Sequence, residues 1–162
     1  MLFPKSAAAF IHKTHTPRTR FSQGPLLELM GLGGPLPDKI LVVDDDPFIC
    51  SALSGALKRW GYEVATETDP LVALDRVQVC PPSLVLLDVV MPQMFGPEFL
   101  QEAKAIKPSL PVIMVTGVQD EAAASLAKKM GALDYLYKPI DMDQLQRSVK
   151  SALDDRPGPK AG

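Results

Sequence analysis

The sequence predicts an α/β protein, namely a doubly wound, five-stranded parallel sheet with helices on both faces. Five short apolar runs alternate with five segments of helical periodicity. Three of the runs, 40–43, 84–87 and 112–115, are apolar throughout, as expected for strands that are covered on both faces. Right-handed crossovers through the intervening helices would join such strands into one parallel sheet.

The first strand, ILVV, leads directly into three aspartates and a proline. Asp46 followed by Pro47 is typical of a helix N-cap with proline at the first helical position, so a helix is predicted over 47–60. Its apolar residues recur at intervals of three and four, and Gly61 ends it. The second strand and helix are predicted over 62–65 and 70–79.

The same alternation continues to residue 153. The run SLVLLD predicts the third strand, PVIMVTG the fourth and DYLYKP the fifth. Gly131 is expected to stop the fourth helix. The predicted elements are strands over 84–87, 112–115 and 135–137, and helices over 97–106, 121–130 and 142–153.

The chain is expected to contain one domain, over 38–154, with a flexible or weakly ordered extension at 1–37 and a disordered tail at 155–162. The stretch MGLGGPLPD is rich in glycine and proline, as a flexible connector would be. Residues 1–37 carry four basic and one acidic side chain, whereas residues 38–162 carry 13 basic and 18 acidic ones. An acidic body argues against direct nucleic-acid binding.

Composition favours a cytoplasmic protein. Of the 162 residues, 46% are hydrophobic and 22% charged, which suits a soluble domain. No apolar run approaches the roughly 18–20 residues of a membrane-spanning helix, and the opening segment lacks a secretory core. Cys50 and Cys80 lack the spacing of a metal site and are predicted to be buried, reduced thiols.

Polar side chains stand at the carboxyl ends of four of the five predicted strands. In a parallel sheet these ends share one edge, and ligands bind there beside the point where the strand order reverses. The side chains are Asp44 and Asp45 after the first strand, Asp88 at the third, Thr116 at the fourth and Lys138 at the fifth.

These residue types indicate phosphoryl chemistry. Clustered carboxylates bind hard divalent cations, and Mg²⁺ prefers one or two carboxylates together with water and phosphate oxygens. A carboxylate beside such a cation can attack phosphorus and form an aspartyl phosphate. Asp88 is alone on the central strand and is the predicted nucleophile, while Asp44 and Asp45 are the predicted metal ligands. Lys138 and Thr116 could stabilise the charge on the transferring group.

Several motifs resemble the receiver domain of two-component response regulators. They are ILVVDDDP, LVLLDVVMP, VIMVTG, GALDYLYKP and the terminal helix IDMDQLQRSVKSAL. Each is weak alone, because three aspartates more often form a turn, but together they follow the family's order and spacing from about residue 39 to residue 153. The resemblance implies the flavodoxin-like, receiver-type (βα)5 fold.

The resemblance also implies a role for each residue of the acidic site. Asp88 would be the phosphoacceptor. Mg²⁺ would bind Asp45 and Asp88 directly and Asp44 through water. The backbone carbonyl of Val90 would complete the metal ligands that the protein supplies.

The same resemblance implies a conformational switch. Thr116 would hydrogen-bond the phosphoryl group, and Lys138 would form an ion pair with it. Tyr135 would be the aromatic residue that swings inward as Thr116 moves, and the peptide bond between Lys138 and Pro139 would be cis. The simpler alternatives are an ordinary strand-end threonine, a solvated lysine and a tyrosine that belongs to a static core.

The function implied is that of a stand-alone signalling switch in a phosphorelay. The phosphodonor would be a histidine kinase or a histidine phosphotransfer protein. The output would be contact with a downstream protein through the helix at 121–130, the strand at 135–137 and the helix at 142–153, and phosphorylation could drive homodimer formation. No membrane or direct nucleic-acid partner is expected, and the chain would catalyse only its own phosphoryl transfer and slow self-dephosphorylation.

Two other classes stay open. A phosphohydrolase would share the nucleophile and the metal, but Val90 stands where such enzymes usually carry a second aspartate. A structural interaction module with a vestigial site is the other alternative, which the complete set of expected residues disfavours. Val90 and Val118, each two residues beyond a site residue, are apolar and bear on the lifetime of a phosphoryl group. Phe95 is expected to fold back onto the helix that follows it.

Overall fold

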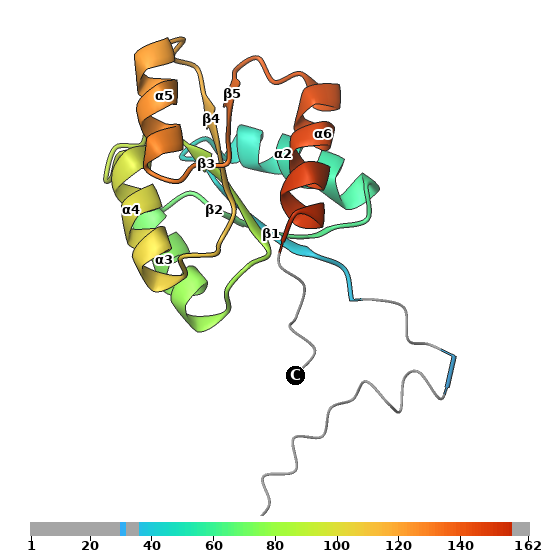
Figure 1. Ribbon diagram of the computed structural model, residues 1–162. Coiled ribbons are helices and arrows are strands. Elements are labelled where there is room, and N and C mark those ends of the chain that lie inside the picture. Colours follow the sequence, from blue (N-terminus) through green and yellow to red (C-terminus); the bar gives the residue numbers. More distant parts are fainter. Residues whose placement is uncertain (1–29, 32–35, 157–162) are drawn as a thin grey trace, which may run out of the picture. The chain divides into compact units, whose positions relative to one another are not determined.

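The computed structural model describes residues 30–31 and 36–156, so nearly all of the predicted extension at 1–37, and the tail from residue 157 onward, lie outside the described residues. Strands and helices alternate five times (Figure 1). The strands are β1 (Lys39–Val43), β2 (Glu63–Glu67), β3 (Leu84–Asp88), β4 (Val112–Thr116) and β5 (Asp134–Tyr137). The helices are α2 (Pro47–Arg59), α3 (Pro70–Val79), α4 (Gly96–Ile106), α5 (Glu121–Lys129) and α6 (Met142–Asp154).

The five strands form one parallel sheet in the order β2-β1-β3-β4-β5, which confirms the predicted fold class. The order reverses between β1 and β3, because β1 pairs with β2 on one side and β3 on the other. Val43 at the end of β1 stands opposite Leu87 of β3. The residues that follow Val43 therefore meet Asp88, which is the last residue of β3.

Helices cover both faces of the sheet (Figure 1). Alternate residues of the central strands enter two apolar clusters: Leu41 and Val43 pack with α3, α4 and α5, whereas Ile40 and Val42 pack with α2 and α6. Phe99 of α4 is fully buried in the first cluster. The burial of both faces explains why the runs of β1, β3 and β4 are apolar throughout.

Local sequence signals set where the helices begin and end. Aspartates cap four of the five N-termini by accepting a hydrogen bond from a backbone N–H, as Asp46 does from Phe48 at 2.8 Å. Gly61, just after α2, and Gly131, just after α5, have φ angles of 94° and 103°. Such left-handed backbone suits glycine, which has no Cβ to clash there.

Three expectations are corrected by the structure. Strand β2 continues to Glu67 rather than ending at residue 65, because it is an edge strand whose polar residues can face solvent. Cys80 is exposed at the end of α3 and not buried, whereas Cys50 is buried as predicted. Phe95 does not fold back onto α4, since its side chain is 60% exposed.

The two ends of the domain meet in one ion pair. The guanidinium of Arg156, two residues after α6, lies 2.6 Å from the carboxylate of Asp38, the residue before β1. Both side chains are about one-third exposed, so the pair contributes little to stability beyond fixing these ends. Within the described part of the chain, no helix has the length and apolar character needed to cross a membrane.

Candidate phosphoacceptor and metal site

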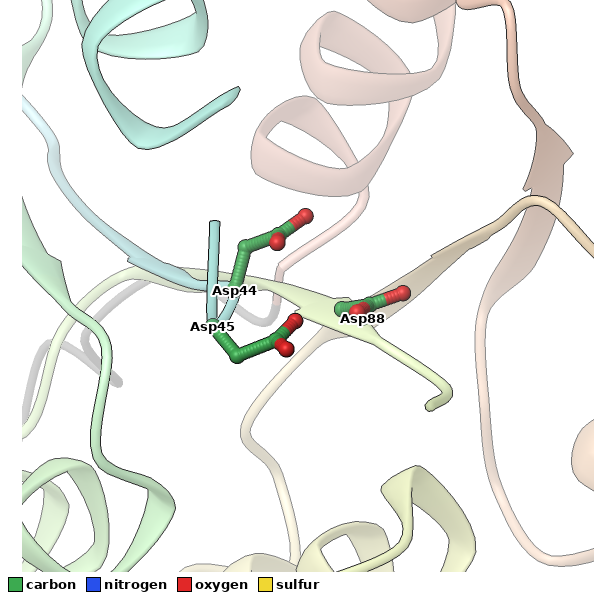
Figure 2. Close-up of side chains that lie close together, drawn as sticks. All are labelled: Asp44, Asp45 and Asp88. Carbon is green, nitrogen blue, oxygen red and sulfur yellow. The ribbon is translucent and has the colours of Figure 1, made fainter. Parts of the chain in front are cut away.

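The predicted site residues gather at the carboxyl edge of the sheet, beside the reversal of strand order. Asp44 and Asp45 follow β1, and Asp88 ends β3. Figure 2 shows their carboxylates directed toward a common space. Oxygen atoms of the three side chains lie within 4.8 Å of one another.

This cluster fits a hard divalent cation. Asp44 and Asp88 are buried, with 2% and 6% of their surfaces exposed, whereas Asp45 is open to solvent. Two protected carboxylates and an exposed one would leave room for water and phosphate oxygens, which Mg²⁺ keeps in its coordination shell. Asp46 lies outside the cluster, because its carboxylate caps α2.

Lys138 joins two of the carboxylates across the site. It follows β5, and its Nζ lies 2.8 Å from Oδ2 of Asp44 and 3.4 Å from Oδ1 of Asp88. The ammonium group is half-buried, so water screens these pairs less than it would screen pairs on the surface. The peptide bond between Lys138 and Pro139 is cis, as predicted.

Burial and charge shift the titration of this group of residues. Desolvation and the neighbouring carboxylate of Asp44 raise the pKa of Asp88 from 3.8 to about 6, although Lys138 and the backbone of Val90 oppose the shift. Desolvation acts to lower the pKa of Lys138, but its bonds to Asp44 and Asp88 outweigh that effect and raise it. Lys138 is therefore a fixed positive charge, and Asp88 is mostly ionised at pH 7.

Thr116 ends β4 and stands opposite Tyr137 of β5, whereas Tyr135 stands opposite Met114, two residues earlier on each strand. Thr116 is fully buried, and its hydroxyl accepts a hydrogen bond from the Val118 N–H at 3.1 Å. Its carbonyl accepts one from the Lys138 N–H at 2.7 Å, which couples the two loops at the edge of the sheet.

Tyr135 points inward. Its ring is 7% exposed, and its buried hydroxyl has no partner of normal hydrogen-bond geometry among the described residues. Desolvation raises the pKa of Tyr135, and the nearby Thr116 side chain opposes that shift only in part. A buried hydroxyl without a hydrogen-bond partner costs free energy.

Two residues near the site were not predicted from the sequence to belong to it. The Sγ of Cys50, in the first turns of α2, is 3.3 Å from the backbone carbonyl of Asp44. Desolvation and the Asp44 charge raise the pKa of Cys50 to about 11, so it is a thiol at neutral pH. Its position four residues after the capping aspartate was the available signal, because such a residue can reach back toward the strand end.

Gly96 is the second. A Cβ at this position would lie 2.8 Å from the carbonyl oxygen of Asp88 and 2.8 Å from Cα of Val89. The start of α4 therefore touches the backbone of the loop after β3 directly, and the Gly96 N–H donates to the Val89 carbonyl at 2.8 Å. The dipeptide Gly-Pro at a predicted helix start was the signal in the sequence.

Several exposed apolar side chains stand close in sequence to the site residues. Val90 and Val118 are each 49% exposed, and Phe48 and Phe95 are more exposed still. Val90 stands in the loop after β3 and Val118 in the loop after β4. Neither can hydrogen-bond a water molecule through its side chain.

The fold and site together define a class of protein, the CheY-like receiver domains. A receiver domain protein (CheY-like) from Methanospirillum hungatei has a crystal structure that superposes with a TM-score of 0.71 and 31% sequence identity, covering 74% of this chain and 96% of that one. The receiver domain of NtrX from Brucella abortus gives a TM-score of 0.69 at 35% identity, covering 72% and 98%.

A family model described as the response regulator receiver domain matches residues 40–150. This chain belongs to that family, which acts in two-component signalling. The transcriptional regulatory protein ZraR of Klebsiella oxytoca is 46% identical over 114 residues, which are 70% of this chain and 26% of ZraR. The alkaline phosphatase synthesis transcriptional regulatory protein PhoP of Bacillus subtilis is 36% identical over 71% of this chain and 48% of PhoP. The chain thus spans less than half of each of these relatives.

Proposed function

We propose that this protein is a phosphorylation-activated switch in which Asp88 accepts a phosphoryl group from a phosphohistidine with the help of Mg²⁺. The observation that carries the proposal is the gathering of three carboxylates within 4.8 Å, with Lys138 reaching both Asp44 and Asp88. Asp44, Asp45, Asp88 and the backbone carbonyl of Val90 would hold the cation. The donor would be a histidine kinase or a histidine phosphotransfer protein in the cytoplasm.

In the proposed reaction an ionised oxygen of Asp88 attacks the phosphorus. The phosphorus–nitrogen bond of the donor breaks, and the imidazole nitrogen keeps its electron pair and takes a proton from solvent. Mg²⁺, when bound, would neutralise negative charge on the phosphoryl oxygens. Lys138 already spans the two buried carboxylates, so its ammonium can turn to a phosphoryl oxygen on Asp88 with little movement.

The signal would leave the site through Thr116 and Tyr135. A phosphoryl oxygen that accepts a hydrogen bond from the Thr116 hydroxyl would draw this side chain toward Asp88, and the Tyr135 side chain would move into the space that it leaves. The output surface would be formed by α5, β5 and α6, where Leu126 and Met142 are exposed apolar side chains. A downstream protein, or a second copy of the chain, would bind there.

A small phosphodonor with a phosphorus–nitrogen bond, phosphoramidate, tests the proposal without a cognate kinase. Incubation with Mg²⁺ should add one phosphoryl group per chain, measured by intact mass. Excess EDTA should prevent this addition. Equal labelling with and without EDTA would contradict the proposed role of the cation.

Millimolar Mg²⁺ is expected to raise the melting temperature of the wild type, because a cation that binds only the folded state stabilises it. Asp45→Ala should abolish this rise, since it removes the exposed carboxylate of the cluster. Asp46→Ala is the matched control: it removes the adjacent negative charge but leaves the cluster complete, so it should keep the Mg²⁺ response. Differential scanning fluorimetry over a Mg²⁺ series measures both. An undiminished response in Asp45→Ala would remove this residue from the site.

The aspartyl phosphate is expected to hydrolyse slowly. Hydrolysis needs a water in line with the phosphorus–oxygen bond, opposite the leaving carboxylate. Val90 and Val118 are half-exposed and each stands two residues beyond a site residue, so they would flank the path of that water and offer it no hydrogen bond. The double variant Val90→Asn, Val118→Gln should shorten the half-life roughly tenfold or more by positioning the water. Decay after removal of the phosphodonor is followed by intact mass, and a double variant that decays no faster than wild type would rule out this explanation.

A further inference from the structure

The carbonyl group of Asp44 lies where the sheet stops. The last pair of the β1–β2 ladder is Val43 with Glu67. One more backbone hydrogen bond follows, from the Asp44 N–H to the Glu67 carbonyl at 3.2 Å. The chain then turns into α2, so the backbone of Asp44 connects a rigid strand to the acidic loop.

Cys50, in α2, lies next to this connection between strand and loop. Its Sγ is 3.3 Å from the Asp44 carbonyl and 3.9 Å from the Glu67 carbonyl. The thiol has a single proton, and the shorter distance assigns it to Asp44. The Cys50 N–H in turn donates to the Asp46 carbonyl at 3.1 Å, so one residue is bonded to both ends of the loop from Asp44 to Asp46.

We propose that Cys50 is a positioning residue for the Mg²⁺ site: its thiol holds the Asp44 carbonyl and thereby fixes the loop that carries Asp44 and Asp45. The inference rests on the proposed function, since it concerns the cation of the same site. Cys50 would touch neither the cation nor the phosphoryl group. Its effect on Mg²⁺ binding would be transmitted through the backbone of Asp44.

The side chain of Asp44 shows why this backbone matters. Its Oδ1 accepts a hydrogen bond from the Asp46 N–H at 2.9 Å, and its Oδ2 pairs with Lys138 at 2.8 Å. A rotation of the Asp44–Asp45 peptide would disturb both contacts and redirect the Asp45 carboxylate. Removing a group that orients a metal ligand typically lowers the affinity of the site for the metal.

Water can reach the neighbourhood of the Cys50 thiol through a groove. A groove of about 450 Å³ runs between α2 and β2 and is lined by Cys50, Ser51, Thr66 and Thr68, among others. Cys50 is 4% exposed at its floor. A side chain without a hydrogen-bond donor at this position would leave the Asp44 carbonyl to accept hydrogen bonds from water in the groove, which can bind it in several orientations.

Cys50 also packs in the apolar cluster with Leu53 and Leu57, so loss of packing has to be separated from loss of the hydrogen bond. Cys50→Val keeps a similar volume without a donor, and Cys50→Ala removes the donor with less bulk. Cys50→Ser keeps a donor. Cys80→Ser changes the exposed cysteine at the end of α3 and serves as the control.

The experiment is Mg²⁺ binding to the full chain by isothermal titration calorimetry, without any phosphodonor. The dissociation constant should rise roughly three- to tenfold in Cys50→Val and Cys50→Ala, as for a lost hydrogen bond that orients a ligand. Cys50→Ser should restore it to near the wild-type value, and Cys80→Ser should leave it unchanged. Rescue by serine is the result that a purely packing role would not give, because serine fills the cluster less well than valine.

Two results would overturn the inference: Cys50→Val and Cys50→Ala that bind Mg²⁺ as tightly as wild type, or a Cys50→Ser variant as weakened as both. Both donor-free variants are measured, so that the inference can still be tested with one of them if the other does not fold. Wild-type protein that binds no Mg²⁺ would instead contradict the proposed function itself.

Discussion

Gly96→Ala is expected to destabilise the protein by about 2–3 kcal/mol and to slow phosphorylation of Asp88. The added Cβ would lie 2.8 Å from the carbonyl oxygen of Asp88, 2.8 Å from Cα of Val89 and 3.0 Å from Cε of Met114. Backbone atoms cannot turn aside as a flexible side chain can, so α4 or the loop after β3 must move. That loop carries the Asp88 carbonyl and Val90, so the variant should be less stable and the geometry of the site should be disturbed.

Gly55→Ala is the matched control. Gly55 lies in the middle of α2, and the nearest atom to an added Cβ is the Nη1 of the Arg59 side chain at 3.7 Å. Alanine is a better helix former than glycine, so this change should stabilise the protein by up to about 1 kcal/mol. Urea denaturation measures both variants. A Gly96→Ala variant as stable as wild type would show that the contact between α4 and the loop is not constrained.

Asp88→Asn is expected to stabilise the metal-free protein at neutral pH by on the order of 2 kcal/mol. Burial and the charge of Asp44 raise the folded-state pKa of Asp88 from 3.8 to about 6. The ionised carboxylate therefore costs stability in full above about pH 6. This cost shrinks as the pH falls from 6 to 3.8 and disappears below that range, where the group is protonated in both states. Asparagine is neutral at every pH, so its advantage should be full above pH 6, smaller at pH 5 and absent below about pH 3.8.

Urea titrations of both proteins in EDTA, at pH 5 and pH 8, measure this dependence. Asp75→Asn, which neutralises an exposed carboxylate on α3, should show little effect at either pH. An Asp88→Asn variant that is less stable than wild type at pH 8 would mean that the carboxylate is stabilised by Lys138 more than it is penalised by burial.

The fold was predictable because each local signal agreed with the others. The apolar strand bodies of β1, β3 and β4 identified a sheet covered on both faces, and Asp46 followed by Pro47 marked a helix start that the structure confirms. The wrong predictions concern residues whose solvent exposure or strand length depends on their position in the tertiary structure. β2 lies at a sheet edge, Cys80 is just past a helix end, and Phe95 precedes one, so solvent access could not be inferred from the residue type.

The site residues that stand at the ends of strands could be predicted from the sequence, because these ends meet at one edge of the sheet. The parallel register alone places Asp44, Asp45 and Asp88 side by side, and Lys138 reaches them from β5. Gly96 and Cys50 were missed because they act through backbone atoms. A steric limit at one Cα, or a thiol directed at one carbonyl, appears only when the loop conformations are known.

The central claim is that Asp88 itself receives the phosphoryl group. Its most direct test is reduction of the phosphorylated protein with borohydride, which cleaves an acyl phosphate and converts the labelled aspartate to homoserine, followed by peptide mapping by mass spectrometry. The account predicts homoserine at residue 88 and at no other aspartate, and only in samples that received both phosphodonor and Mg²⁺. Homoserine at residue 44 or 45, or a phosphoryl group that survives reduction on another side chain, would contradict it.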